Sequence, residues 1–186
     1  MDSERFWQMI DAARGQADGW EEMFDPLVGS LEKLGEEEIF LWQRIFDEYL
    51  QLSYKNKLWA AAYVINGGCS DDGFDYFRAW LIAQGKDVFM KSLCDPESLA
   101  DASIVEEDDA EFEEIIGAAP DAYLRKLGIE DLDYDRFYNE LDKRPLTDTQ
   151  MAEIAAEIKY ASDIDNSWKE DGLEELLPRL CEAFGW

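Results

Sequence analysis

One short stretch of the chain concentrates the side chains that could do chemistry. Residues 66–73 read Asn-Gly-Gly-Cys-Ser-Asp-Asp-Gly, and Asp75 and Arg78 follow them. Arg78 comes one helical turn after Asp75, so these two side chains can form an ion pair. Carboxylates at Asp71 and Asp72, in a partly apolar setting, can have separate pKa values and act as an acid and a base. The spacing therefore predicts a polar cluster that holds a cation or orients a polar ligand.

Aromatic residues on both sides of this loop are candidate pocket walls, with Trp59 before it and Trp80 after it. The candidate ligand-binding residues are Asn66, Asp71, Asp72, Asp75, Arg78, Trp59 and Trp80. A structural interpretation fits the same residues. In it, Asp71 or Asp72 caps a helix, the glycines make a tight turn and the tryptophans anchor the core. Both interpretations stay open at this point.

The chain contains no histidine, which excludes several common mechanisms. Ser-His-Asp and Cys-His nucleophiles and His-containing zinc sites all need that side chain. Cys69, Cys94 and Cys181 are too few for a four-cysteine zinc site, and their sparse, odd number fits a reducing cytoplasm better than a disulfide framework. A helix start would favour a thiolate at Cys69, but the adjacent Asp71 and Asp72 oppose it. We name no catalytic residue and no metal ligand, and we expect no cofactor.

Two stretches carry oxygen-bearing side chains at the spacing of calcium-binding loops, residues 131–142 and residues 163–174. Such loops need a glycine at the sixth position for their sharp turn. That position is Arg136 in the first stretch and Trp168 in the second. A chain with 44 acidic residues produces these spacings by chance, so they predict no calcium site.

The formal net charge of the chain is −27. Binding to nucleic-acid phosphates or to anionic membranes depends mainly on Lys and Arg, so we expect neither partner. The charge allows a basic protein partner or a cation. It also keeps a protein soluble and favours a monomer.

The acidity is concentrated in one tract, residues 95–142, with seventeen acidic residues and three basic ones. A tract of this kind is most simply a solvated face. It could also be a docking surface for a basic partner, or a mimic of nucleic acid in which carboxylates are spaced like phosphates.

Apolar residues recur at helical spacing along most of the chain, and no segment alternates as a strand would. We expect an all-α fold of about eight or nine helices with no substantial sheet. It should form a single domain over residues 1–186, with an aromatic-rich half, 1–100, and an acidic half, 101–186, packed on it. Eight helices are predicted at approximately 2–14, 18–34 with a kink at Pro26, 36–50, 56–65, 72–84, 88–93, 147–160, and 171–184 with a bend at Pro178. Two short helical segments also fit, at 109–116 and 120–127.

Apolar residues make up 47% of the 186-residue chain, enough to form a full core. The longest purely apolar run is Leu58 to Ile65, far shorter than the roughly 20 residues that span a bilayer. The first residues, Met-Asp-Ser-Glu-Arg-Phe-Trp, do not have the pattern of a signal peptide. The sequence therefore predicts a cytoplasmic protein.

Several motifs within residues 1–125 resemble a bacterial family catalogued as domain of unknown function 4240. They are Phe6-Trp7, the run 58–63, Gly67 to Asp72, then Phe74, Phe77-Arg78, Trp80-Leu81 and Gly85, followed by Asp95-Pro96 and Leu99-Ala100. The specific part is Ser-Asp-Asp-x-Phe-x-x-Phe-Arg-x-Trp-Leu, residues 70–81. The resemblance implies a cytoplasmic bacterial protein and assigns no activity.

These observations favour a non-enzymatic binding or interaction protein with an acidic surface for a basic protein partner. The alternative is a small-molecule or cation-binding site, which could extend to hydrolysis, formed by Asp71, Asp72, Asp75 and Arg78.

Overall fold

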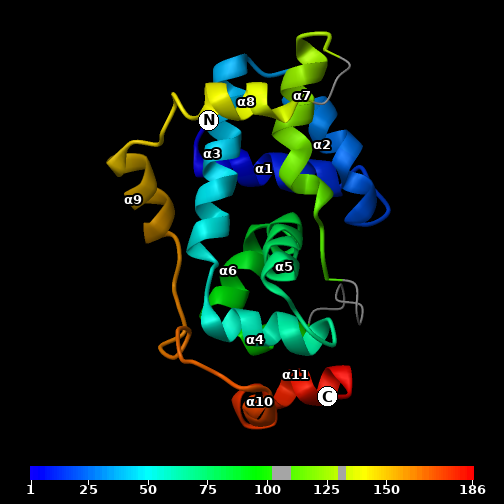
Figure 1. The fold of residues 1–186 in the computed structure, drawn as a ribbon, viewed down its shortest axis with the longest axis vertical. Helices are drawn as coiled ribbons and strands as arrows, with labels where there is room; N and C mark the ends of the chain where they lie inside the picture. The colour runs from blue at the N-terminus through cyan, green and yellow to red at the C-terminus, as the bar shows by residue number, and fades with distance from the viewer. Residues whose placement is uncertain (102–109, 130–132) are drawn as a thin grey trace. The chain divides into compact units, whose positions relative to one another are not determined.

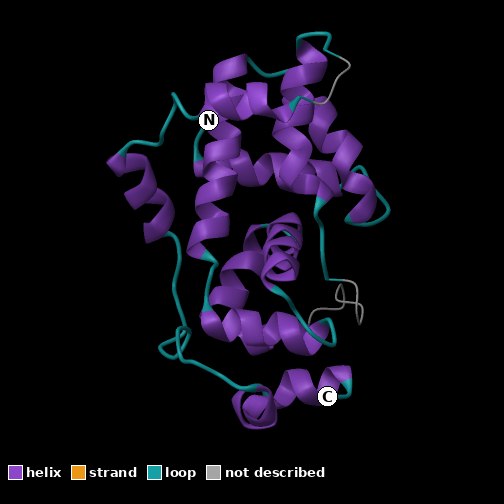
Figure 2. Ribbon diagram, in the orientation of Figure 1, coloured by secondary structure: helices purple, strands orange, loops and turns teal. Residues whose placement is uncertain are grey.

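The computed structural model describes residues 1–101, 110–129 and 133–186, and in these ranges the chain is helical without any strand. Figure 2 shows helices joined by loops throughout. The predicted all-α class is confirmed. The predicted count of eight or nine helices is wrong, because the described residues form eleven α-helices and four short 3₁₀-helices.

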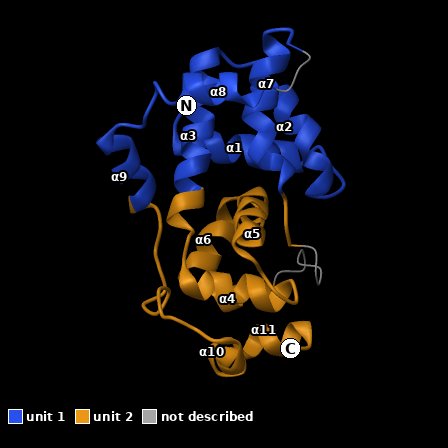
Figure 3. Cartoon of the chain, viewed as in Figure 1, with its two compact units in different colours: residues 1–49, 113–155 blue, residues 50–112, 156–186 orange. Residues whose placement is uncertain are grey.

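The chain divides into two compact units, and each combines two separate segments of sequence (Figure 3). Unit 1 consists of residues 1–49 and 113–155, and unit 2 of residues 50–112 and 156–186. Both units therefore draw on the first and the second half of the chain. The single domain with an aromatic half and an acidic half stays a prediction.

Unit 1 is held together by aromatic side chains from helices far apart in sequence. Its elements are α1 (Ser3–Arg14), η1 (Glu21–Met23), α2 (Phe24–Leu31), α3 (Glu36–Leu52, up to Tyr49), η3 (Glu114–Gly117), α7 (Ala118–Lys126), α8 (Tyr134–Leu141) and α9 (Asp148–Ala156). Phe6 of α1 packs on Trp42 of α3, and the Trp7 Nε1–H donates to the Tyr49 hydroxyl at 3.0 Å. Phe40 of α3 stacks on Phe137 of α8. Large buried rings of this kind dominate the packing of a core.

Unit 2 is built around a helix that is buried along most of its length. Its elements are α4 (Asn56–Ile65), α5 (Asp71–Ala83), α6 (Lys86–Cys94), η2 (Pro96–Asp101), η4 (Glu170–Gly172), α10 (Leu173–Leu176) and α11 (Pro178–Phe184). Figure 1 labels the α-helices among them. From Phe77 to Ala83, every residue of α5 is buried. The buried alanines Ala60, Ala61 and Ala62 let α4 approach its neighbours α5, η2 and α11 closely.

The differences from the predicted helices have local causes. The segment 18–34 divides at residue 24 into η1 and α2, two residues before the predicted kink at Pro26. Pro178 starts a new helix, α11, because a proline fits the first helical position and disrupts an interior one. Helix α8 was missed, and only residues 114–116 of the predicted segment 109–116 are helical, as part of η3; residue 109 lies outside the described residues.

Within the part of the chain that the structure describes, no helix is both long enough and apolar enough to cross a membrane. The cytoplasmic location stays a prediction.

Thr147 and Gln150 cap the start of α9 through two reciprocal hydrogen bonds. The Gln150 N–H donates to Thr147 Oγ1 at 3.3 Å, and Gln150 Oε1 accepts from the Thr147 N–H at 3.0 Å. Such reciprocal caps contribute about 1 kcal/mol. Thr147→Ala should therefore accelerate amide hydrogen exchange in residues 148–156 about five-fold.

The matched control for this measurement is Thr149→Ala, which makes the same chemical change within the same helix. Acceleration of equal size in both variants would show that Thr147 is not the cap.

Candidate functional site

The loop between α4 and α5 is a tight turn that needs its glycines. Asn66 ends α4, and Gly67 and Gly68 follow with φ angles of 60° and 139°. A side chain rarely adopts these positive φ values, so the two glycines permit the turn as the sequence predicted. The turn brings the end of a buried helix directly to the start of α5.

The side-chain amide of Asn66 is used by the chain itself. Its Nδ2 donates to the Ala110 carbonyl at 3.3 Å, and its Oδ1 accepts from the Ala110 N–H at 3.1 Å. Two residues later, the Phe112 N–H donates to the Tyr76 carbonyl. Asn66 therefore attaches the segment that begins at residue 110 to the loop.

Ser70 is the N-cap of α5, so the prediction that Asp71 or Asp72 caps this helix is wrong. The Gly73 N–H donates to Ser70 Oγ at 3.0 Å. Asp71 and Asp72 occupy the first turn of the helix, and both are exposed. Their negative charges are stabilised there by the positive end of the helix dipole. Serine is as good a cap as aspartate, and residue type alone could not separate the three candidates.

Arg78 is buried, with only 5% of its surface exposed, and its guanidinium is surrounded by acceptors. Nη1 donates to the Leu50 carbonyl at 2.6 Å, Nε donates to the Phe74 carbonyl at 3.2 Å, and Nη2 pairs with Asp75 as predicted. Burial lowers the pKa of Arg78, while the nearby Asp75 raises it. The guanidinium therefore ties α5 to the preceding chain and is not directed at a ligand.

The charged cluster continues to the surface through Tyr54, which is 44% exposed. Its hydroxyl donates to Asp71 Oδ1 at 3.1 Å, and its ring lies 4.8 Å from the Arg78 guanidinium. Asp71, Asp75 and Arg78 are therefore brought together, partly through a tyrosine that the sequence did not single out.

The two tryptophans that the sequence nominated as pocket walls have different environments. Trp80 is 1% exposed and packs against Phe77 in the core of unit 2. Trp59 is half-buried, stacks on Phe74 with ring centroids 4.9 Å apart, and its Nε1–H donates to the Cys69 carbonyl at 3.1 Å.

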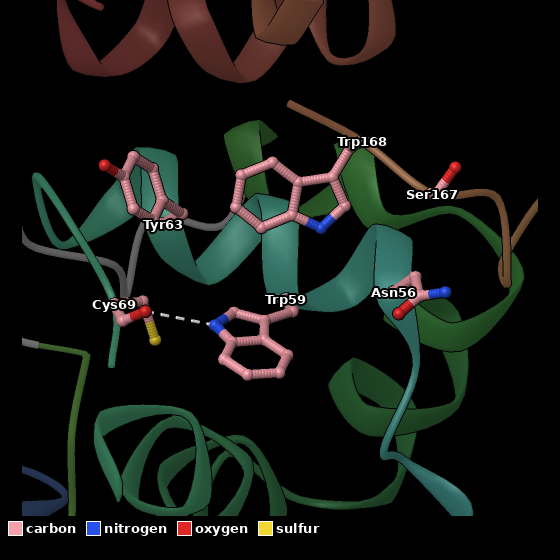
Figure 4. A pocket seen from close by; sticks show the side chains of 6 residues that line it. All are labelled: Asn56, Trp59, Tyr63, Cys69, Ser167 and Trp168. Atoms are coloured by element: carbon pink, nitrogen blue, oxygen red, sulfur yellow. Dashed lines mark hydrogen bonds between the residues drawn. The ribbon is translucent and has the colours of Figure 1, made fainter. Parts of the chain in front are cut away.

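Trp59 borders a surface hollow of about 300 Å³, which we call the aromatic hollow. It is lined by Asn56, Trp59, Tyr63, Cys69, Ser167 and Trp168. Figure 4 shows the rings of Trp168 and Tyr63 on one side and that of Trp59 on the other. Trp168 reaches the hollow from a segment more than one hundred residues after Trp59, and sequence reasoning had no local signal for this pairing.

A second, more open depression lies next to the aromatic hollow and is lined by Lys169, Glu170, Asp171 and Trp186. Tyr63 contacts residues of both depressions, because its ring centroid lies 5.3 Å from that of Trp168 and 5.4 Å from that of Trp186. Its hydroxyl donates to Glu170 Oε2 at 3.3 Å. Desolvation raises the pKa of Tyr63, and the Glu170 carboxylate adds to the effect, so the phenol stays protonated.

Cys69 is not an activated nucleophile. Burial, together with the nearby Glu111 carboxylate, raises the pKa of its thiol to about 12. The thiolate is the reactive form, and at neutral pH almost none is present.

In the second stretch with the spacing of a calcium-binding loop, residues 163–174, two of the carboxylates form ion pairs with lysines. Lys57 Nζ lies 2.7 Å from Asp163, and Lys55 Nζ lies 3.1 Å from Asp165. In the first such stretch, residues 131–142, residues 134–141 form a helix, and residues 131 and 132 lie outside the described residues. Over residues 1–101, 110–129 and 133–186, no three Cys, Asp or Glu side chains are grouped as a metal ion would require.

A comparison with known families places the chain in a family. The family model described as protein of unknown function DUF4240 matches residues 1–125, so the chain belongs to this family. No curated protein and no solved structure matches the chain. Ser167 and Trp168, which complete the aromatic hollow, lie beyond the matched residues.

The structural role of Arg78 predicts a large effect for a conservative change. Arg78→Lys keeps the charge but cannot reach the Leu50 and Phe74 carbonyls and Asp75 together. Hydrogen bonds to charged groups contribute about 1.5 to 3 kcal/mol, so urea unfolding should show a loss of this size in the free energy of unfolding.

Arg179→Lys is the control, since Arg179 is an exposed arginine of the same unit and pairs with Asp101. Exposed pairs contribute less than about 1 kcal/mol. Equal losses in the two variants would contradict a structural role specific to Arg78.

The raised pKa of Cys69 predicts slow alkylation by iodoacetamide. The exposed Cys94 should react first at about pH 8. The Cys69 rate, followed by mass spectrometry of its peptide, should rise about ten-fold per pH unit up to at least pH 10, because the thiolate fraction grows in this way below a pKa of about 12. A rate that levels off near pH 9 would refute the raised pKa.

Proposed function

We propose that this DUF4240 protein is a non-enzymatic binding protein that takes a basic protein partner on an acidic surface. The observation that carries the proposal is the surface hollow of unit 2 walled by Trp59, Tyr63 and Trp168, in a unit whose formal net charge is −12. An aromatic patch within a charged surface is typical of a protein interaction site.

The charge of unit 2 supports this function. Its two segments contain 20 acidic and 8 basic residues, a formal net charge of −12. Of its basic residues, Lys55, Lys57, Arg78, Lys86 and Arg179 form ion pairs with described carboxylates of the same unit. With a net charge of −12, the unit as a whole attracts cations.

The alternative, a hydrolytic or cation-binding site at Asp71, Asp72, Asp75 and Arg78, has less support. Arg78 is buried and its donors are taken by carbonyls and by Asp75. The Asp71 carboxylate accepts from Tyr54. Asp71, Asp75 and Arg78 therefore make contacts within the unit, and these contacts favour a structural role for the cluster.

The nucleic-acid mimic needs carboxylates arrayed along residues 95–142. Six of the seventeen acidic residues in that tract, namely Glu106, Glu107, Asp108, Asp109, Glu130 and Asp131, lie outside the described residues. Nothing in the described part of the tract favours this function over a docking surface.

The proposal is tested by affinity capture from host extract at low salt, followed by calorimetry with each purified candidate. We expect a basic protein that binds in a one-to-one ratio and whose affinity falls at least ten-fold between about 50 mM and 300 mM salt, because screening weakens charge attraction. Polyglutamate of equal charge is the control bait. If every captured protein also binds polyglutamate equally well, or if the saturable partner is acidic, the proposal is wrong.

A further inference from the structure

We infer that the aromatic hollow receives an arginine side chain of the basic partner. The inference rests on the proposed function and names the group that the site would recognise. It follows from four properties of the hollow: the type of its walls, their rigidity, its size and the charge around it.

Three of the six lining residues are aromatic, and they come from two segments of unit 2. Trp59 and Tyr63 lie one turn apart on α4, and Trp168 comes from the segment before η4. Figure 4 shows the three rings around the same space. The faces of aromatic rings carry partial negative charge and attract a cation within about 6 Å, and a planar guanidinium also stacks on them.

The walls are held in place before any ligand binds. Trp59 is fixed by its stack on Phe74 and by the hydrogen bond from Nε1 to the Cys69 carbonyl. Tyr63 is fixed by contacts with Trp168 and Trp186 and by its hydrogen bond to Glu170. A preorganised site avoids the entropy cost of ordering its side chains on binding.

The volume of about 300 Å³ lies at the lower end of the range for ligand pockets. It suits one side chain better than a larger organic ligand. Asn56 and Ser167 add polar groups at the border, where the donors of a guanidinium would need acceptors.

The charge around the hollow is negative. Glu170 accepts from the Tyr63 hydroxyl, and Glu111 lies close enough to Cys69 to raise its pKa. Lys55 and Lys57, on the same chain segment as Asn56, are paired with Asp165 and Asp163. Lys169 lies in the neighbouring depression together with two carboxylates, Glu170 and Asp171.

The same unit already contains the contact that we propose. The Arg78 guanidinium lies 4.8 Å from the ring centroids of both Tyr54 and Phe74. A neutral planar ligand would use the aromatic walls equally well but would gain nothing from the surrounding carboxylates. The test therefore compares two ligands of the same shape, one with a positive charge and one without.

The experiment measures calorimetric binding of a tetra-arginine amide peptide to the full chain at about 50 mM salt, where screening is weak. A tetra-citrulline peptide has the same shape without the charge. We expect the arginine peptide to bind and the citrulline peptide to bind at least ten-fold more weakly. Equal binding of the two peptides would overturn the inference in favour of a neutral ligand.

Variants of Trp168 test the location of the site. Trp168→Leu removes an aromatic wall without changing the net charge and should weaken binding about 5- to 30-fold, whereas Trp168→Phe keeps a ring and should stay within about three-fold. Tyr138→Leu, which removes an exposed tyrosine of unit 1, is the matched control and should bind as the unchanged protein does.

Ser167→Arg gives a second test that leaves the walls intact, because Ser167 is exposed. It places a guanidinium at the border of the hollow and should weaken peptide binding at least five-fold, whereas Ser162→Arg adds the same charge at another exposed position of the unit and should not.

Peptide binding that is unchanged in both Trp168→Leu and Ser167→Arg would overturn the inference that the hollow receives the arginine, and would leave the acidic surface as the binding site. Failure of the unchanged protein to bind the arginine peptide would also overturn this inference. The capture experiment would then decide the proposed function separately.

Discussion

The buried guanidinium of Arg78 is the interaction on which unit 2 depends. An isolated buried charge is very costly, so a buried arginine persists only where acceptors surround it. Leu50, Phe74 and Asp75 supply those acceptors, and the rings of Tyr54 and Phe74 cover the guanidinium. This requirement fixes the end of α3 against α5 and keeps the guanidinium of Arg78 buried, with its donors directed at groups of the same unit.

The same constraint decides where recognition can occur. Phe74 contacts the Arg78 guanidinium with its ring and also stacks on Trp59, so the buried charge and the aromatic hollow share a wall. Trp59 in turn donates a hydrogen bond to the Cys69 carbonyl, and this bond positions the loop after Gly68. Cys69 itself lines the hollow, and three of the polar residues that the sequence singled out, Asn66, Asp75 and Arg78, make contacts within unit 2.

Local features of the fold could be predicted from the sequence, because they depend on neighbouring residues. Asp2 caps α1, Gly67 and Gly68 turn the chain after α4, and Thr147 pairs with Gln150 at α9. Competing caps at the start of α5 could not be ranked, since Ser70, Asp71 and Asp72 have similar propensities. The aromatic hollow could not be predicted, because Trp59 and Trp168 meet only through tertiary packing.

Charge and aromatic surface contribute differently to recognition by such a protein. A net charge of −27 accelerates encounter with any basic partner, but long-range attraction hardly discriminates between partners. Discrimination depends mainly on how slowly the right complex dissociates, and this depends on short-range contacts in a preorganised pocket. A hollow of about 300 Å³ walled by three aromatic rings, two of them fixed by hydrogen bonds, provides such contacts for one side chain. Trp59 and Tyr63 lie within residues 1–125, which match the family model, and Trp168 lies beyond them, so the hollow combines walls from inside and outside the match.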